Sequence, residues 1–113
     1  MNAAYRQRLE AVFAAAEMPG PMNIAYKSVF GAVAAYADGV IFITSGNFGL
    51  ALKLPGDLCE ALMAEGVCGP LKYFEKGHIK RNYVVLHNAI LDDKARMKAL
   101  LDQSLDFIQN GPS

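Results

Sequence analysis

A long apolar stretch broken by glycines, residues 24–54, constrains the fold more than any other part of the sequence. Charged residues are sparse here and β-forming residues are frequent. Asp38-Gly39 interrupts the stretch as a strong hairpin signal, because both central positions of a type I′ turn need positive φ. The sequence SGN at 45–47 predicts a second turn, and Gly31 predicts a bend or bulge. The stretch therefore predicts an antiparallel meander of strands near residues 25–30, 31–37, 40–44 and 48–53.

Three other segments show the apolar spacing of amphipathic helices: residues 3–17, 55–65 and 92–109. Proline and glycine bound the second segment, and acidic residues begin the third, as helix termini favour. The residues expected to face the core are Tyr5, Leu9, Val12, Phe13 and Ala16 in the first segment, Leu58, Leu62 and Met63 in the second, and Met97, Leu100, Leu101, Leu105 and Ile108 in the third.

Two further strands are predicted near residues 70–75 and 79–86, joined by a weaker turn signal at Lys76-Gly77. The resulting order is α-β-β-β-β-α-β-β-α. Strands in runs with few helices predict an α+β domain, in which helices cover one side of an antiparallel sheet of five to six strands. The length of 113 residues suits one domain spanning 1–113.

The charge balance excludes strong global attraction to nucleic acid or to an anionic membrane, because 11 basic residues offset 11 acidic ones. No stretch approaches 18 uncharged apolar residues, so no membrane span is predicted. The apolar run near the N-terminus is short and has glutamates on both sides, unlike a signal or transit peptide. We therefore expect a cytoplasmic protein with no membrane partner.

No pattern of catalytic residues, metal ligands or cofactor-binding residues stands out. The glycines fit neither a P-loop nor a dinucleotide fingerprint, so they are interpreted as turn formers. Cys59 and Cys68 match no zinc motif and are expected to be reduced thiols, at least one of them packed in the core. His78 and His87 have no carboxylate or cysteine at a ligand spacing. The sequence thus predicts no catalytic residue, no metal and no cofactor.

The most suggestive polar feature is a basic segment with interleaved aromatic residues at 72–81. Such a hairpin can bind phosphates and stack on bases, which is one hypothesis. The favoured interpretation is an edge strand whose lysines discourage aggregation. Arg81 shares a strand face with Tyr83, and an inward-facing Arg81 would need a partner such as Asp38 or Glu75. The residues of the segment are Lys72, Tyr73, Phe74, Lys76, His78, Lys80 and Arg81.

Four segments together resemble the TfoX N-terminal domain family, which is named after a bacterial regulator of competence genes. They are KSVFGAVAAYADGVIF, LALKLP, GPLKYFEKGHIKRNYVVL and ILDDKARMKALLDQSLDFI. Two departures are visible: Ala32 replaces the second glycine of the family's Met-Phe-Gly-Gly stretch, and Lys27 stands where arginine is common. The resemblance implies a stand-alone domain, without the C-terminal helical domain of longer members.

From this resemblance we expect a non-enzymatic regulatory or binding module that acts through protein–protein contacts as a homodimer, in transcription or competence regulation. One alternative is nucleic-acid binding through residues 72–81. Another is a small-molecule site or enzyme between sheet and helices. The residues expected to bind a ligand or partner are Lys27, Phe30, Tyr36, Tyr73, Lys76, Lys80, Arg81 and Tyr83.

Overall fold

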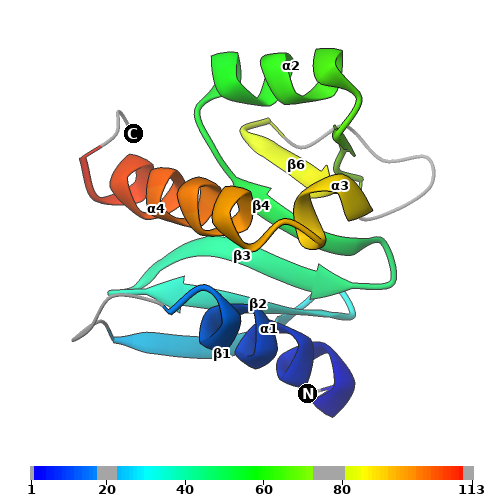
Figure 1. Cartoon of the computed structure of the whole chain (residues 1–113). Coiled ribbons are helices and arrows are strands. Elements are labelled where there is room, and N and C mark those ends of the chain that lie inside the picture. The colour runs from blue at the N-terminus through cyan, green and yellow to red at the C-terminus, as the bar shows by residue number, and fades with distance from the viewer. Residues whose placement is uncertain (1, 18–22, 73–80, 111–113) are drawn as a thin grey trace.

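One antiparallel sheet with helices packed on one face makes up residues 2–17, 23–72 and 81–110, the ranges that the computed structural model describes (Figure 1). Within these ranges the sheet has six strands in the order β1-β2-β3-β4-β6-β5, and each neighbouring pair is antiparallel. This confirms the predicted α+β class. The strands are β1 (Ile24–Val29), β2 (Ala32–Ala37), β3 (Val40–Gly46), β4 (Gly49–Lys53), β5 (Cys68–Pro70) and β6 (Tyr83–Leu86).

Tight turns connect the first four strands. Asp38 and Gly39 have φ values of 49° and 87°, which confirms the predicted turn with two positive φ angles. Phe30 and Gly31, at 47° and 79°, form a second turn of this kind between β1 and β2. The third turn lies at Asn47 and Phe48, one residue later than predicted.

Gly46 is the last residue of β3, where it pairs with Gly49. The ring of Phe48 packs over it, and a Cβ atom at position 46 would lie 2.7 Å from that ring. Glycine therefore lets the aromatic side chain of the turn fold back closely onto the strand.

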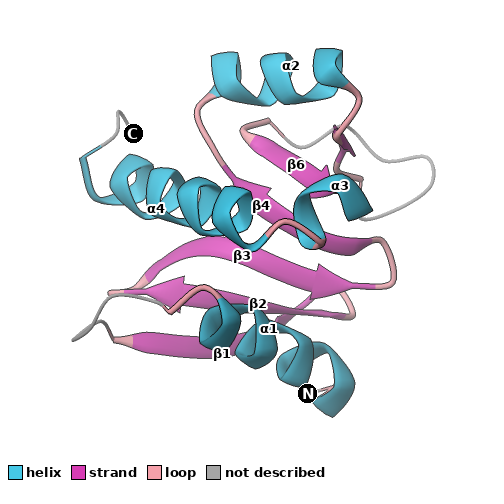
Figure 2. Cartoon of the chain, viewed as in Figure 1, coloured by secondary structure: helices cyan, strands magenta, loops and turns pink. Residues whose placement is uncertain are grey.

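The helices are α1 (Ala3–Ala15), α2 (Gly56–Glu65), α3 (Asn88–Leu91) and α4 (Lys94–Asn110). Helix α1 packs on β2 and β3, α4 on β3 and β4, and α2 beside β5 and β6 (Figure 2). Gly66 ends α2 at φ 85°, as predicted. Asp93 caps α4, because its carboxylate accepts a hydrogen bond from the Arg96 amide at 3.1 Å.

The second half of the sheet differs from the prediction. Of the strand expected at 70–75, only residues 70–72 are described, and there β5 ends at Pro70, where the ladder loses a donor. Arg81 and Asn82 form a turn, so the strand expected at 79–86 begins at Tyr83. Asn82 adopts φ 60°, and its carbonyl accepts a hydrogen bond from the Leu54 amide at 2.9 Å. The predicted Lys76-Gly77 turn lies outside the described residues.

Short helix α3 was not predicted as a separate element. The chain leaves α3 at Asp92, and the cap at Asp93 then starts α4. The single predicted helix of residues 92–109 is therefore the second of two consecutive helices.

The space between helices and sheet is filled. The side chains there include the stacked rings of Phe13 and Phe42, with centroids 5.7 Å apart. The three predicted helix faces all pack in this core, some residues fully buried and others partly. Both cysteines are buried and free, as expected. The completely buried members of the core include Leu9, Val33, Phe42, Ile43, Leu52, Leu54, Val84, Ile90 and Leu101.

A smaller cluster lies on the opposite face of the sheet. It contains Ala51, Leu71 and Tyr83, with Phe48 and Val85 packed against it. None of the helices in the described ranges combines the length and apolar character that a membrane crossing requires.

Candidate functional site

Three of the residues expected to bind a ligand or partner lie on the β1–β2 hairpin: Lys27 in β1, Phe30 in the turn and Tyr36 in β2. Tyr26 packs toward α1 and Phe13, so its neighbour Lys27 points to the opposite, helix-free face of the sheet. On that face the Lys27 ammonium lies 5.0 Å from the centre of the Tyr36 ring. This is a cation–π contact across neighbouring strands. We call these three residues the hairpin surface.

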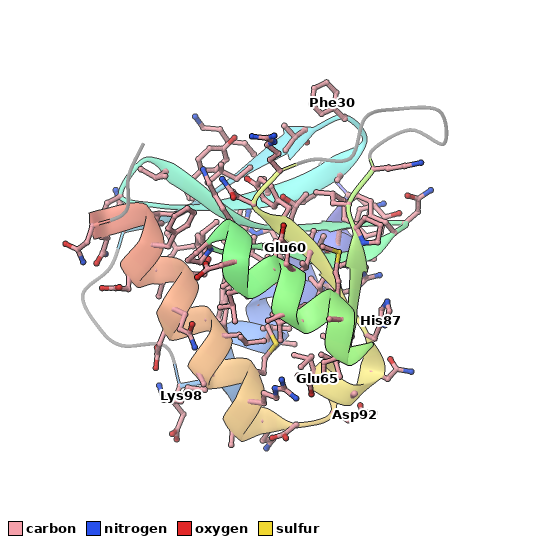
Figure 3. The ribbon with its side chains drawn as sticks, turned by 90° about the horizontal axis from the view of Figure 1, so that it is seen from above. Phe30, Glu60, Glu65, His87, Asp92 and Lys98 are labelled. Carbon is pink, nitrogen blue, oxygen red and sulfur yellow. The ribbon has the colours of Figure 1, made fainter. Side chains whose placement is uncertain are left out.

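Phe30 supplies the apolar part of the hairpin surface. It occupies the turn with φ 47°, which is unusual for a bulky residue, and 66% of its surface is exposed (Figure 3). The turn therefore presents an aromatic ring at the tip of the hairpin, whereas Tyr36, which is paired with Ala25, lies toward the other end of the two strands. Such a surface can bury apolar area and donate hydrogen bonds to a partner.

Arg81 and Tyr83 line a different feature, a groove of about 400 Å³ between α2 and the start of β6. Arg81 is exposed in its turn, so the inward-facing Arg81 that would need a buried partner does not arise. Asp38 instead accepts a hydrogen bond from the Asn23 amide at 3.3 Å. Tyr83 is 6% exposed, and the Lys53 amine lies 6.0 Å from its ring. The other lining residues of this α2 groove are Gly56, Cys59, Glu60, Met63 and Asn82.

Three of the residues expected to bind a ligand or partner lie outside the described residues: Tyr73, Lys76 and Lys80. Lys72 and Arg81 are exposed at the ends of the flanking described ranges. Lys27 and Tyr36 are thus in contact on one face of the hairpin, Phe30 lies at its tip, and Arg81 and Tyr83 line the α2 groove.

The thiol in the α2 groove is not prepared for nucleophilic chemistry. Burial raises the pKa of Cys59 from 9.0 to about 11, although a hydrogen bond to the Leu54 carbonyl acts in the other direction. A thiol with that pKa is protonated at neutral pH, whereas a nucleophile needs the thiolate. Cys59 therefore acts as a packing group.

Across residues 2–17, 23–72 and 81–110, no three His, Cys, Asp or Glu side chains gather closely enough to hold an ion. His87 lies at the start of α3, with its Nδ1 atom 3.4 Å from the Gly66 carbonyl. Its imidazole is thus placed beside the C-terminus of α2.

A second surface groove, of about 380 Å³, lies beside α4. For the small-molecule site expected between sheet and helices, the described residues offer the α2 groove, which lies between α2 and the start of β6 and includes Arg81 and Tyr83. The residues that line the α4 groove are Pro55, Asp102, Gln103, Asp106, Phe107 and Asn110.

One cluster of side chains that was not predicted from the sequence lies at the edge of the sheet. The Arg6 guanidinium carbon is 4.4 Å from the centre of the Tyr26 ring, and its Nε atom is 3.6 Å from the Glu10 carboxylate. Burial is the main reason that the pKa of Tyr26 is raised, and Glu10 adds to the effect. The i, i+4 spacing of Arg6 and Glu10 is a visible sequence signal, but their contact with Tyr26 depends on how α1 crosses the sheet.

Comparison with protein families gives a match. The family model of the TfoX N-terminal domain matches residues 17–108, a range that contains all six described strands. No match was found among curated proteins.

Proposed function

The chain belongs to the TfoX N-terminal domain family, and from that premise we propose that it is a small non-enzymatic regulatory module that works by binding another protein. The family takes its name from a regulator of competence genes, so the proposed setting is transcription or competence regulation. The proposed contact surface is the hairpin surface of Lys27, Phe30 and Tyr36.

The exposure of Phe30 is the observation that carries this proposal. Among the described residues, the exposed large apolar side chains are Phe30, at 66%, and Val40, at 39%. Aromatic residues are enriched at protein interfaces, where they bury large area at low entropic cost. Lys27 and Tyr36 would supply polar contacts farther along the same hairpin.

The alternative functions have weaker support. The exposed Lys72 and Arg81 favour nucleic-acid binding near residues 72–81, but the zero net charge provides no wider positive field. The α2 groove contains Arg81 and Tyr83 and would suit a small molecule. Its thiol is protonated at neutral pH, however, so the groove offers no activated nucleophile.

Affinity capture with matched variants tests the proposal. The baits are the natural chain, Phe30→Ser, Lys27→Ala and the control Lys98→Ala, whose side chain lies on α4, across the molecule from Phe30 (Figure 3). Each recovered protein is then purified and its direct affinity measured. We expect a partner whose binding weakens about tenfold or more with Phe30→Ser and stays unchanged with Lys98→Ala. Equal binding by all four baits would contradict the proposal.

The same purified chain should be titrated with labelled mixed-sequence DNA and RNA at low salt. The proposed function predicts no retention. Retention that falls steeply with added salt, and falls again with Arg81→Ala, would favour the nucleic-acid alternative instead.

A further inference from the structure

We propose that strand β1 pairs with β1 of a second copy of this chain, about a two-fold axis through Tyr26. Strand β1 is the edge of the sheet, and among the described residues it pairs with β2 alone. Figure 1 shows it at the lower edge of the sheet, with no described strand beyond it. The occupant proposed for this edge is a second, identical β1.

Alternation along the ladder identifies the backbone groups that face outward. The Asp38 amide donates to the Asn23 carbonyl at 3.0 Å, so position 23 hydrogen-bonds to the β2 side. Antiparallel partners alternate between bonded and non-bonded pairs, so Ala25 and Lys27 also face β2. Ile24, Tyr26 and Ser28 consequently direct their N–H and C=O groups toward the outer edge.

The two edges of the sheet differ in how well they are protected. The opposite edge strand, β5, has three residues and ends in Gly69-Pro70, features that interrupt strand addition. Strand β1 has six residues, contains no proline and carries one charge, Lys27. A long edge with so little protection is a template for another strand.

One register gives every outward-facing N–H and C=O group of β1 a hydrogen-bond partner. With Tyr26 opposite Tyr26 of the second copy, Ile24 lies opposite Ser28, and each facing pair exchanges two hydrogen bonds. Lys27 then lies opposite Ala25. A register centred on Lys27 would place two ammonium groups directly opposite each other, which is destabilising.

The charges above this edge balance within each chain. Arg6 lies over the Tyr26 ring and pairs with Glu10, and their side chains are 47% and 50% exposed. An axis through Tyr26 brings the Arg6–Glu10 pair of one copy near that of the other. The Glu10 carboxylate of each chain then offsets its own guanidinium close to the axis, so the two pairs meet without a net charge.

This inference goes beyond the proposed function, because it uses the strand edge and does not require the hairpin surface. The contact consists of one short strand and part of α1, so it resembles a small interface. We expect a dissociation constant on the order of 10–100 µM. A chain that stays monomeric can still bind a partner through the hairpin surface. Equally, a chain that captures no partner can still dimerise through β1.

Sedimentation velocity from about 5 to about 500 µM tests the dimer. The variant Ser28→Pro removes an outward donor without breaking a bond to β2, and Ser28→Thr is the control that keeps the donor. We expect the natural chain and Ser28→Thr to dimerise, and Ser28→Pro to bind at least about tenfold more weakly. Circular dichroism and thermal melting establish that Ser28→Pro is folded.

Hydrogen exchange provides a second measurement that needs no variant. As the concentration rises, the amides of Ile24, Tyr26 and Ser28 should become protected together, while those of β5 stay unchanged. Charge reversal adds a third: Arg6→Glu should weaken the dimer, and Arg6→Glu with Glu10→Arg should restore it. A monomer at every concentration, or a dimer in which these three amides exchange freely, would overturn the proposal.

Discussion

The guanidinium of Arg96 meets the carboxylate of Glu65 in a two-pronged pair, with nitrogen–oxygen distances of 2.6 and 2.5 Å. The two residues are 31 positions apart, and their contact joins the C-terminal end of α2 to the first turn of α4. Two parallel hydrogen bonds fix the relative angle of the planar groups. This surface pair therefore helps to set how α2 is held against the rest of the helical layer.

Replacing Glu65 with glutamine should lower the melting temperature slightly at pH 7. Hydrogen bonding to Arg96 lowers the pKa of Glu65 below its ordinary 4.5. A carboxyl whose pKa is lower in the folded state stabilises the fold above its unfolded pKa, and the stabilisation is lost as pH falls through the folded pKa. The difference between the natural chain and Glu65→Gln should thus shrink below about pH 4.5.

Thermal melts at several pH values, with and without added salt, measure this difference. Glu60→Gln is the matched control, because Glu60 is exposed on the same helix (Figure 3). Salt should weaken the Glu65 effect, since both side chains of the pair are partly in water. The interpretation is wrong if Glu60→Gln and Glu65→Gln behave alike.

Replacing Thr44 with valine should stabilise the protein. Thr44 is completely buried in β3, and its hydroxyl has no hydrogen-bond partner within the described residues. Valine has nearly the same shape as threonine but lacks the hydroxyl, which gave up its hydrogen bonds to water when the chain folded. We therefore expect a gain of about 1 kcal/mol in the free energy of unfolding. Urea titration of the two chains measures it.

Thr44→Ser is the matched control. It keeps the hydroxyl and deletes the methyl group, so it should destabilise by about 1 kcal/mol. If Thr44→Val destabilises the protein as much as Thr44→Ser does, the Thr44 hydroxyl has a hydrogen-bond partner and the predicted stabilisation is wrong.

The first four strands could be predicted because their signals are local. Asp38-Gly39 combines two residues that tolerate positive φ, and both adopt it. Helices α1, α2 and α4 follow from apolar spacing in the same way, whereas the short α3 has no such signal. The second half of the sheet was harder, because β6 lies between β4 and β5, and its limits depend on pairing with residues far away in the sequence. Arg81 continues the apparent strand pattern, yet the neighbouring Asn82 turns the chain before Tyr83 pairs with Lys53.

The candidate site, like the fold, could be predicted from the sequence only in part. The composition of the hairpin surface was visible in the sequence, but the contact of Lys27 with Tyr36 depends on the β1–β2 register, in which Lys27 is paired with Ala34. Single-sequence patterns do not fix such diagonal neighbours. The Glu65–Arg96 pair and the packing of Arg6 on Tyr26 also arise from tertiary structure, so no local spacing could reveal them.

The two cysteines should be unreactive in the folded protein and should make it less stable at high pH. Burial raises the pKa of Cys59 and of Cys68 from 9.0 to about 11, and for Cys68 the nearby Cys59 adds to the effect. Labelling with a chromogenic disulfide at pH 8 should therefore be slow, roughly a hundredfold slower than in denaturant, because the thiols must first be exposed.

The pH dependence follows from the same shift. A thiol whose pKa is higher in the folded state stabilises the fold fully below pH 9 and loses that contribution as pH rises toward 11. Other groups titrate in this range, so the comparison must be with Cys59→Ala/Cys68→Ala. That variant should be less stable at pH 7, because it leaves cavities in the core, but its melting temperature should fall less between pH 8 and pH 10.5. Rapid labelling of the native chain, or parallel pH profiles of the two proteins, would show that the thiols are more accessible than their packing indicates.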